Sequence, residues 1–306
     1  MVTRRGTDFA GHDCLKLENK AVALWVARQV GPRILGLALP GGPNLFAELP
    51  EYTLECPGVG PYWLRGGHRL WYAPEDARRT YLPDDDPLAI TEIENGLRVT
   101  QPVEASTGIQ KSLTVSLPGP EARVVVDHRL HNQGRSPIEL APWAITQLKP
   151  GGVAVLPQAK ALADEYGLLP NRHIVLWPYT RVDSPQITWG DRYLLVEATM
   201  REGALKIGFP NPDGWLAYAV DDTLFVKQAP YLTGADYYDR GSSSECYCNP
   251  RFLELETLGP RTMLAPGESV THQETWVVYE GVPVQPGWVA VEAVLGRLGL
   301  TERAAS

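Results

Sequence analysis

The segment Trp63–Glu75, with the sequence WLRGGHRLWYAPE, gathers side chains that could bind a polar ligand at one bend of the chain. Arg65, His68 and Arg69 supply hydrogen-bond donors, and a guanidinium can bind hydroxyl or carboxylate groups in pairs. Trp71 adds a flat apolar face, and the glycine pair permits a sharp turn or a close backbone approach. Sugars present CH faces and hydroxyl rims, so they suit such a set. The same residues are also typical of a β-bulge with core tryptophans, and the local pattern does not decide between the two.

A second candidate is the segment RFLELETLGP, which predicts a strand with two carboxylates on one face. Glu254 and Glu256 would share that face, while Leu253 and Leu255 would point into the core. Residues two apart on a strand lie about 6.6 Å apart at their Cα atoms. Neighbours on one strand approach a substrate from the same side, so at most one carboxylate is expected to transfer a proton and the other to orient the substrate. Two glutamates on a solvated sheet face are the alternative.

Three further strands carry weaker signals. His272 and Glu274 share a face of SVTHQETWVVYE, either as a pair with tuned pKa values or as a cluster on the outside of a sheet, and the outside is favoured. Lys227 in LFVKQAP could reach a pocket, as could Glu245 and Tyr247 in SSSECYCNP.

Motifs for several other chemistries are absent from the sequence. There is no GxSxG, HExxH, P-loop or GxGxxG pattern, so nothing predicts a metalloprotease, a nucleotide-dependent or a dinucleotide-dependent enzyme. The four cysteines lack zinc-ligand spacing and are expected to be ordinary reduced thiols. The acidic run Asp84–Asp86 lacks the spaced ligands of a calcium loop and is expected to be solvated. We therefore expect neither a metal nor an organic cofactor.

The overall composition narrows the class of partner. The chain has 306 residues, of which 44% are hydrophobic, and its net charge is −8. Proteins that bind phosphate backbones usually carry a basic surface, so nucleic acid is not an expected partner. No apolar stretch follows the basic residues near the N-terminus, and no apolar run reaches the roughly 20 residues of a membrane helix. We expect a cytoplasmic protein that does not bind membranes, and the sequence leaves a homodimer open.

The spacing of apolar residues predicts an all-β protein. In ARVVVDHRL, apolar and polar residues alternate, so that Val124, Val126, His128 and Leu130 share one face. About fifteen such short segments are separated by turn residues, which favours a large antiparallel sandwich of two sheets. The whole chain, residues 1–306, is expected to form one domain with a core at about residues 19–280.

Helix patterns occur in two places. One is the short segment Ala159–Leu169. The other is a tail at about residues 286–303, where an apolar stripe includes Val291, Val294, Leu295 and Leu298. We expect this tail to pack on the sandwich as a short C-terminal helix.

Taken together, these segments resemble the galactose mutarotase-like (aldose 1-epimerase-type) superfamily, and within it a bacterial branch known as a domain of unknown function. The segment at 31–46, GPRILGLALPGGPNLF, is similar to the opening hairpin of mutarotases. LRGGHRLWYAPE is similar to the Arg-Gly-Gly stretch of hexose-6-phosphate epimerases, and FLELETLGP to the strand with the catalytic glutamate. The resemblance covers about residues 19–280 and implies a β-supersandwich that acts on sugars.

The resemblance also implies roles for individual residues. Mutarotation needs a base at the anomeric hydroxyl and an acid at the ring oxygen. Glu256 matches the catalytic glutamate and would be the base. Trp143 lies in PIELAPWAIT, where mutarotases carry their catalytic histidine, so His68 is the substitute acid that we predict. Sugar-binding residues would be Arg65, Arg69, Trp71, Trp143, Lys227 and Glu254.

Two alternatives to an aldose 1-epimerase remain open. The missing histidine favours a carbohydrate-binding protein without catalytic activity. A hexose-phosphate epimerase would need several cations around one phosphate, and Arg65, Arg69 and Lys227 could supply them. In each case the expected partner is a small sugar or sugar derivative.

Overall fold

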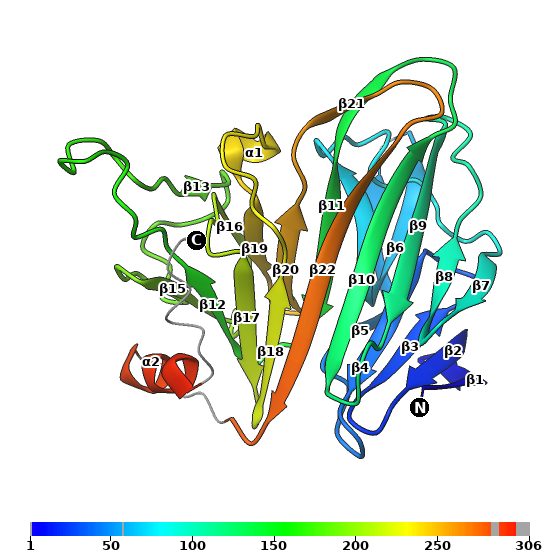
Figure 1. The fold of residues 1–306 in the computed structure, drawn as a ribbon, viewed down its shortest axis with the longest axis horizontal. Coiled ribbons are helices and arrows are strands. Elements are labelled where there is room, and N and C mark those ends of the chain that lie inside the picture. The colour runs from blue at the N-terminus through cyan, green and yellow to red at the C-terminus, as the bar shows by residue number, and fades with distance from the viewer. Residues whose placement is uncertain (1, 57, 283–287, 298–306) are drawn as a thin grey trace.

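The computed structural model describes residues 2–56, 58–282 and 288–297, which form two large antiparallel sheets packed face to face (Figure 1). The first sheet has the order β1 (Thr3–Phe9), β2 (His12–Glu18), β3 (Ala23–Ala27), β4 (Arg33–Ala38), β6 (Gly60–Ala73), β11 (Ile138–Leu148), β20 (Leu253–Leu258), β19 (Ser244–Cys248), β16 (Leu205–Phe209) and β13 (Val175–Leu176). In addition, β5 (Glu48–Cys56) pairs with β6, and β21 (Thr262–Leu264) pairs with β11.

The second sheet has the order β14 (Ile187–Thr188), β15 (Tyr193–Glu197), β12 (Val153–Pro157), β17 (Trp215–Val220), β18 (Thr223–Gln228), β22 (Ser269–Glu280), β10 (Arg123–Asn132), β9 (Ile109–Ser116), β8 (Gly96–Thr100) and β7 (Ala89–Ile93). Alternating apolar residues of both sheets fill the space between them. The predicted all-β sandwich of two large antiparallel sheets is therefore confirmed, although β1 and β2 precede the predicted core.

The helix predictions have mixed outcomes. The C-terminal helix α2 (Trp288–Arg297) packs Val291, Val294 and Leu295 on the face of the second sheet that is turned away from the first. Leu298 lies outside the described residues. The predicted helix at 159–169 is wrong: the segment is irregular, because the Asp164 carboxylate accepts the backbone N–H groups of Tyr166 and Leu169 and holds a turn instead. The other helix, α1 (Tyr238–Gly241), is a single turn. Neither described helix is long and apolar enough to span a membrane.

Strand β6 contains a bulge that determines which side chains face outward. Three consecutive residues, Arg65, Gly66 and Gly67, have positive φ angles of 56°, 84° and 73°. A Cβ atom on Gly66 would lie 1.9 Å from the Ala47 carbonyl oxygen, and one on Gly67 would lie 2.2 Å from the carbonyl oxygen of Ile34. Only glycine fits at these two positions, so the pair serves the close approach of neighbouring strands.

The bulge shifts the alternation of β6 by one residue. Before it, the even-numbered Tyr62 and Leu64 lie on the face of the first sheet that is turned away from the second, which we call the outer face. After it, the odd-numbered Trp71 lies there, whereas Leu70 packs between the sheets. Residues on both sides of the bulge therefore contribute to one apolar cluster on the outer face.

A pair of arginines anchors this bulge. Arg33 is fully buried, and its guanidinium contacts the Asp84 carboxylate at 2.9 Å, the Leu64 carbonyl oxygen at 2.8 Å and the Tyr62 hydroxyl at 2.5 Å. Arg65 pairs with the same Asp84 at 2.7 Å and also with Asp85. The prediction that this acidic run is only a solvated loop is thus wrong for Asp84, which neutralises two buried or nearly buried cations.

The space between the sheets contains a polar network among its apolar side chains. Lys227 is fully buried, and its Nζ lies 2.9 Å from Glu274, 3.1 Å from the Thr146 hydroxyl and 2.9–3.0 Å from two backbone carbonyl oxygens. His68 contacts Thr146 through Nδ1 at 2.9 Å and His128 through Nε2 at 2.7 Å. The pair His272 and Glu274 therefore faces the core and not the outside, contrary to the sequence-based expectation.

The hydrogen-bond partners of His68 and His128 determine which ring nitrogen of each carries the hydrogen. Nδ1 of His128 lies 2.8 Å from the backbone carbonyl oxygen of His272, so it must carry the hydrogen. Nε2 of His128 then accepts the Nε2–H of His68, and Nδ1 of His68 accepts from the Thr146 hydroxyl. Each ring is satisfied only when it is uncharged.

We predict that these histidines make the unfolding free energy fall as the pH drops below about 6.5. Burial lowers the pKa of His128 and His272 to about 3 and that of His68 well below its ordinary value of 6.5. Between these values the unfolded chain binds more protons than the folded one, so acid favours unfolding by up to about 1.4 kcal/mol per pH unit for each histidine.

Urea unfolding between pH 7 and pH 5.5 measures this slope. His128→Asn should reduce it, whereas His173→Asn, at an exposed histidine, should leave it unchanged. Equal slopes for the wild type and His128→Asn would contradict the assignment.

A second prediction concerns Asp84 and Asp85, the two aspartates that pair with Arg33 and Arg65, which should contribute differently to stability. Asp84→Asn should lower the unfolding free energy by about 3–5 kcal/mol, because it leaves the buried Arg33 without its anion. Asp85→Asn should cost no more than about 1 kcal/mol, since the Asp85 side chain is 56% exposed and solvent screens its ion pair. Denaturant titration of both variants tests this, and similar losses for the two would contradict the proposed difference.

Candidate functional site

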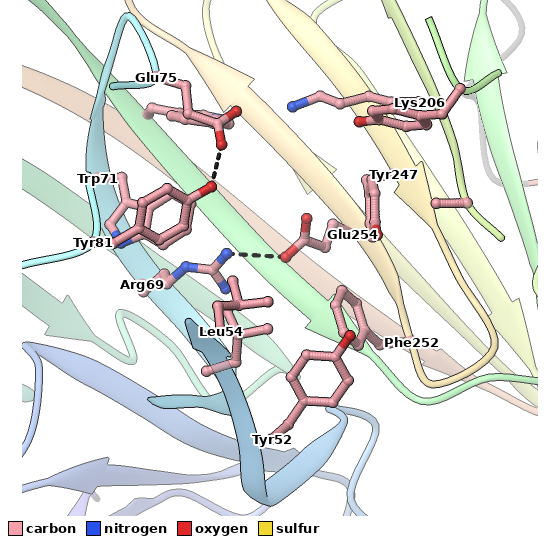
Figure 2. Close-up of a pocket in the computed structure, with 14 residues that line it drawn as sticks. Tyr52, Leu54, Arg69, Trp71, Glu75, Tyr81, Lys206, Tyr247, Phe252 and Glu254 are labelled. Atoms are coloured by element: carbon pink, nitrogen blue, oxygen red, sulfur yellow. Dashed lines mark hydrogen bonds and ion pairs between the residues drawn. The ribbon is translucent and has the colours of Figure 1, made fainter. Parts of the chain in front are cut away.

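A cavity of about 330 Å³ opens on the outer face of the first sheet, at the end of β6 that follows the bulge. This volume lies at the lower end of the range for small-molecule sites. Much of its wall is aromatic, formed by Trp71, Tyr81, Trp143, Tyr179, Tyr247 and Phe252. The charged residues of the wall are Arg69, Glu75, Lys206 and Glu254 (Figure 2).

Adjacent strands bring these side chains together in rows across the sheet. Trp71 on β6 lies opposite Trp143 on β11, and their rings are 5.4 Å apart in an edge-to-face arrangement. The next row on this face pairs Ile145 with Arg69 and Glu256, and the row after it pairs Glu254 with Gln147 on one side and with Tyr247 on the other. Residues directly opposite each other in a sheet point to the same face, so the pairing alone places these groups on the cavity side.

Arg69 and Glu254 form an ion pair at the cavity wall. Arg69 Nη2 lies 3.0 Å from Glu254 Oε1, which also accepts the side-chain amide of Gln147 at 2.9 Å. The guanidinium lies 4.1 Å from the ring centre of Trp71, a cation–π contact. Arg69 Nε and Nη1 and Gln147 Oε1 are buried without a hydrogen-bond partner among the described residues. Two donor atoms of Arg69 and one acceptor of Gln147 are therefore unused near the Glu254 carboxylate, although Gln147 itself does not line the cavity.

The carboxyl group of Glu254 is suited to accept a proton. Burial raises its pKa above the ordinary value, although the nearby Arg69 partly opposes this shift. No hydrogen bond to its second oxygen, Oε2, occurs in the described residues, and this oxygen points away from Arg69 in Figure 2. A carboxylate with a raised pKa and a free oxygen is a typical general base.

Lys206 forms a second charged cluster with two glutamates. Its Nζ lies 2.6 Å from Glu245 and 3.0 Å from Glu256, and it lies within 4.7 Å of the ring centres of Trp143 and Trp177. The two carboxylates raise the pKa of Lys206 well above its ordinary value, so its ammonium stays charged. Burial raises the pKa of Glu245 well above its usual range, which favours a shared proton in this cluster.

Glu256 lies beneath the cavity wall. It is fully buried, and its Oε2 accepts the Trp143 indole N–H at 2.7 Å as well as a hydrogen bond from Lys206. Glu256 faces the same side of the sheet as Glu254, as the alternation predicted, but Trp143 and Lys206 stand between it and the cavity. Of these two glutamates, Glu254 is the one that lines the cavity.

Glu75 and Tyr81 form a further part of the wall. The Tyr81 hydroxyl donates a hydrogen bond to the Glu75 carboxylate, which Figure 2 marks with a dashed line. Glu75 is exposed and has no ion-pair partner among the described residues. Its carboxylate is thus free to contact a ligand.

The structure separates the sequence-predicted residues into two groups. Arg69, Trp71, Trp143 and Glu254 line the cavity, and Glu256 lies directly behind it. His68, Lys227 and Arg65 do not line it.

His68 and Lys227 lie in the network between the sheets, so the predicted pairing of His68 with Glu256 as acid and base needs correction. His68 precedes Arg69 in β6 and must point to the opposite face. The Arg65 guanidinium is directed to Asp84 and Asp85.

Several cavity residues were missed by the sequence analysis. Lys206 alternates with Leu205 and Ile207 on β16, so its outward direction was readable, but its contact with Glu256 depends on the strand order β20–β19–β16. Tyr81 and Tyr179 come from loops, where no periodic signal exists. Tyr247 was noted only as a residue that could reach a pocket.

Comparison with known proteins supports the fold through structure and not through sequence. No protein-family model matches the chain, and no curated protein matches it. A galactose mutarotase-like protein from Lactobacillus casei has a TM-score of 0.52 at 11% identity, over 87% of this chain and 100% of its own.

Two further solved structures agree with this one. A candidate aldose 1-epimerase from Escherichia coli has a TM-score of 0.52 at 12% identity, over 92% of this chain and all of its own. Another candidate aldose 1-epimerase, from Klebsiella pneumoniae, has a TM-score of 0.58 at 9% identity, over 97% of this chain and 85% of its own. The protein therefore has the fold of the galactose mutarotase-like proteins.

Proposed function

We propose that the protein binds a sugar of monosaccharide size in the cavity beside Arg69 and Glu254. The observation that carries this proposal is the combination, in one cavity, of aromatic walls with the Arg69–Glu254 ion pair and with the Glu254 oxygen that accepts no hydrogen bond from the described residues. A sugar ring can place its CH face on an aromatic side chain while its hydroxyls meet such donors and acceptors. The fold shared with mutarotase-like structures supports the same class of ligand.

The positions of the cations argue against a phosphorylated sugar. A phosphate site would have combined Arg65, Arg69 and Lys227, but only Arg69 lines the cavity. Arg69 is already paired with Glu254, and Lys206 is paired with two carboxylates. Among the described residues that line the cavity, a phosphate would therefore meet no uncompensated cation, and we set the hexose-phosphate epimerase aside.

A second candidate function is interconversion of the sugar's anomers, which the raised pKa and free oxygen of Glu254 favour. Glu254 would take the proton of the anomeric hydroxyl while the bond from the anomeric carbon to the ring oxygen breaks. The ring oxygen would receive a proton from the Lys206 ammonium, which would in turn take up the proton shared with Glu245 beside it. Ring closure on the other face of the aldehyde reverses these transfers. The base role that the resemblance implied for Glu256 passes to Glu254 in this proposal.

Titration calorimetry with galactose and glucose tests the binding proposal. Arg69→Lys keeps the charge but loses the forked donors, so we expect its affinity to fall about tenfold or more, a loss of about 1.4 kcal/mol. Arg98→Lys, at an exposed arginine of β8, is the matched control and should bind like the wild type. Absence of sugar binding, or equal affinity of both variants and the wild type, would contradict the proposal.

Polarimetry on freshly dissolved α-glucose and α-galactose tests the catalytic candidate. Glu254→Gln should abolish any acceleration over buffer while sugar binding persists, and the wild-type rate should rise with pH as Glu254 loses its proton. Glu256→Gln, at the other glutamate on the same face of β20, is the variant for comparison. If Glu254→Gln keeps the wild-type rate and Glu256→Gln abolishes it, Glu256 is the base. Sugar binding without acceleration in the wild type identifies a non-catalytic binding protein.

A further inference from the structure

The balance of charge in the cavity constrains its ligand further, provided that it binds a sugar as proposed above. Both cations of the wall are neutralised by protein carboxylates. Arg69 lies 3.0 Å from Glu254, and Lys206 lies 2.6 Å and 3.0 Å from two glutamates on neighbouring strands. Neither cation offers a net positive charge to a ligand.

Glu75 adds a negative charge that the cavity does not compensate. Its carboxylate lines the cavity and receives only the Tyr81 hydroxyl among the described residues. Counted pair by pair, Arg69 cancels Glu254, and Lys206 at most cancels its two glutamates. The net charge of the cavity wall is therefore negative, whether or not the cluster of Lys206 with its two glutamates holds an extra proton.

The aromatic wall strengthens the preference for a cation. The faces of tyrosine and tryptophan rings attract ammonium groups, and Arg69 and Lys206 already use Trp71 and Trp143 in this way. The Tyr81 ring packs 5.2 Å from the ring of Trp71 and carries the hydroxyl that holds Glu75. The uncompensated carboxylate therefore lies beside aromatic rings, and this combination suits a positively charged group.

We propose that the sugar bound here carries a free amine, whose ammonium group pairs with Glu75. The amine compensates the charge excess of the wall. The hydroxyls of the same ring meet Arg69 and Glu254, and its carbon face lies on the aromatic rings. Anionic sugars, such as uronic acids, are disfavoured by the same charges.

The test compares pairs of sugars that differ only at one position. Galactose, 2-amino-2-deoxygalactose and 6-amino-6-deoxygalactose are titrated at pH 6.5, together with the glucose counterparts and galacturonic acid. We expect one amino sugar of a pair to bind about tenfold or more tightly than its neutral counterpart, which corresponds to about 1.4 kcal/mol. Added salt should reduce this preference, because it screens the pairing with an exposed carboxylate.

Two variants locate the effect. Glu75→Gln should bring amino and neutral sugars to equal affinity, while Glu94→Gln, at an exposed turn between β7 and β8, should keep the preference. A preference that survives in Glu75→Gln overturns the pairing. If neutral sugars bind as tightly as every amino sugar, this inference fails and the sugar-binding proposal stands. If no sugar binds at all, both fail.

Discussion

A side chain on a strand must take one of the two faces of its sheet, and this constraint on β6, β11 and β20 determines which groups can act together. On β20, Glu254 and Glu256 face outward because Leu253 and Leu255 fill the space between the sheets. On β6, Arg69 reaches the cavity only because the preceding histidine points into the core. No side-chain rotation can bring that histidine to the cavity, so the chemistry of the outer face depends on carboxylates.

The polar network between the sheets makes this placement rigid. Burying Lys227 and Glu274 costs several kcal/mol of desolvation, which is offset only when each group keeps its full set of hydrogen bonds. Those bonds join β18 and β22 of one sheet to Thr146 on β11 and Leu255 on β20 of the other. A shift of either sheet would leave buried charges unpaired. Since Gln147 and Glu254 are the chain neighbours of those two anchors, the network also fixes the cavity wall.

The sequence predicted the features that depend on periodicity alone, such as the face of a strand on which a side chain lies. It did not predict the contacts that depend on which distant strands are adjacent. The alternation in ELE correctly predicted the faces of Glu254 and Glu256, and the apolar stripe predicted the C-terminal helix. Grouping His68 with Arg69 failed because chain neighbours on a strand point to opposite faces. The contact of Lys206 with Glu256 depends on which strands are adjacent, and β16 and β20 are separated by β19. No local pattern carries that information.

Trp143 explains how a shared fold can carry a different site. The resemblance to mutarotases places a catalytic histidine in its segment, and an imidazole there could both donate and accept protons. An indole can only donate, and the N–H of Trp143 is directed to Glu256 at 2.7 Å. That bond, together with Lys206, closes Glu256 off from the cavity and leaves Glu254 as the carboxylate with a free oxygen. At this position the chain therefore has a side chain that can only donate, and Glu254, two residues before Glu256 on the same strand, is the carboxylate that lines the cavity, so the shared fold alone does not carry a mechanism to this chain.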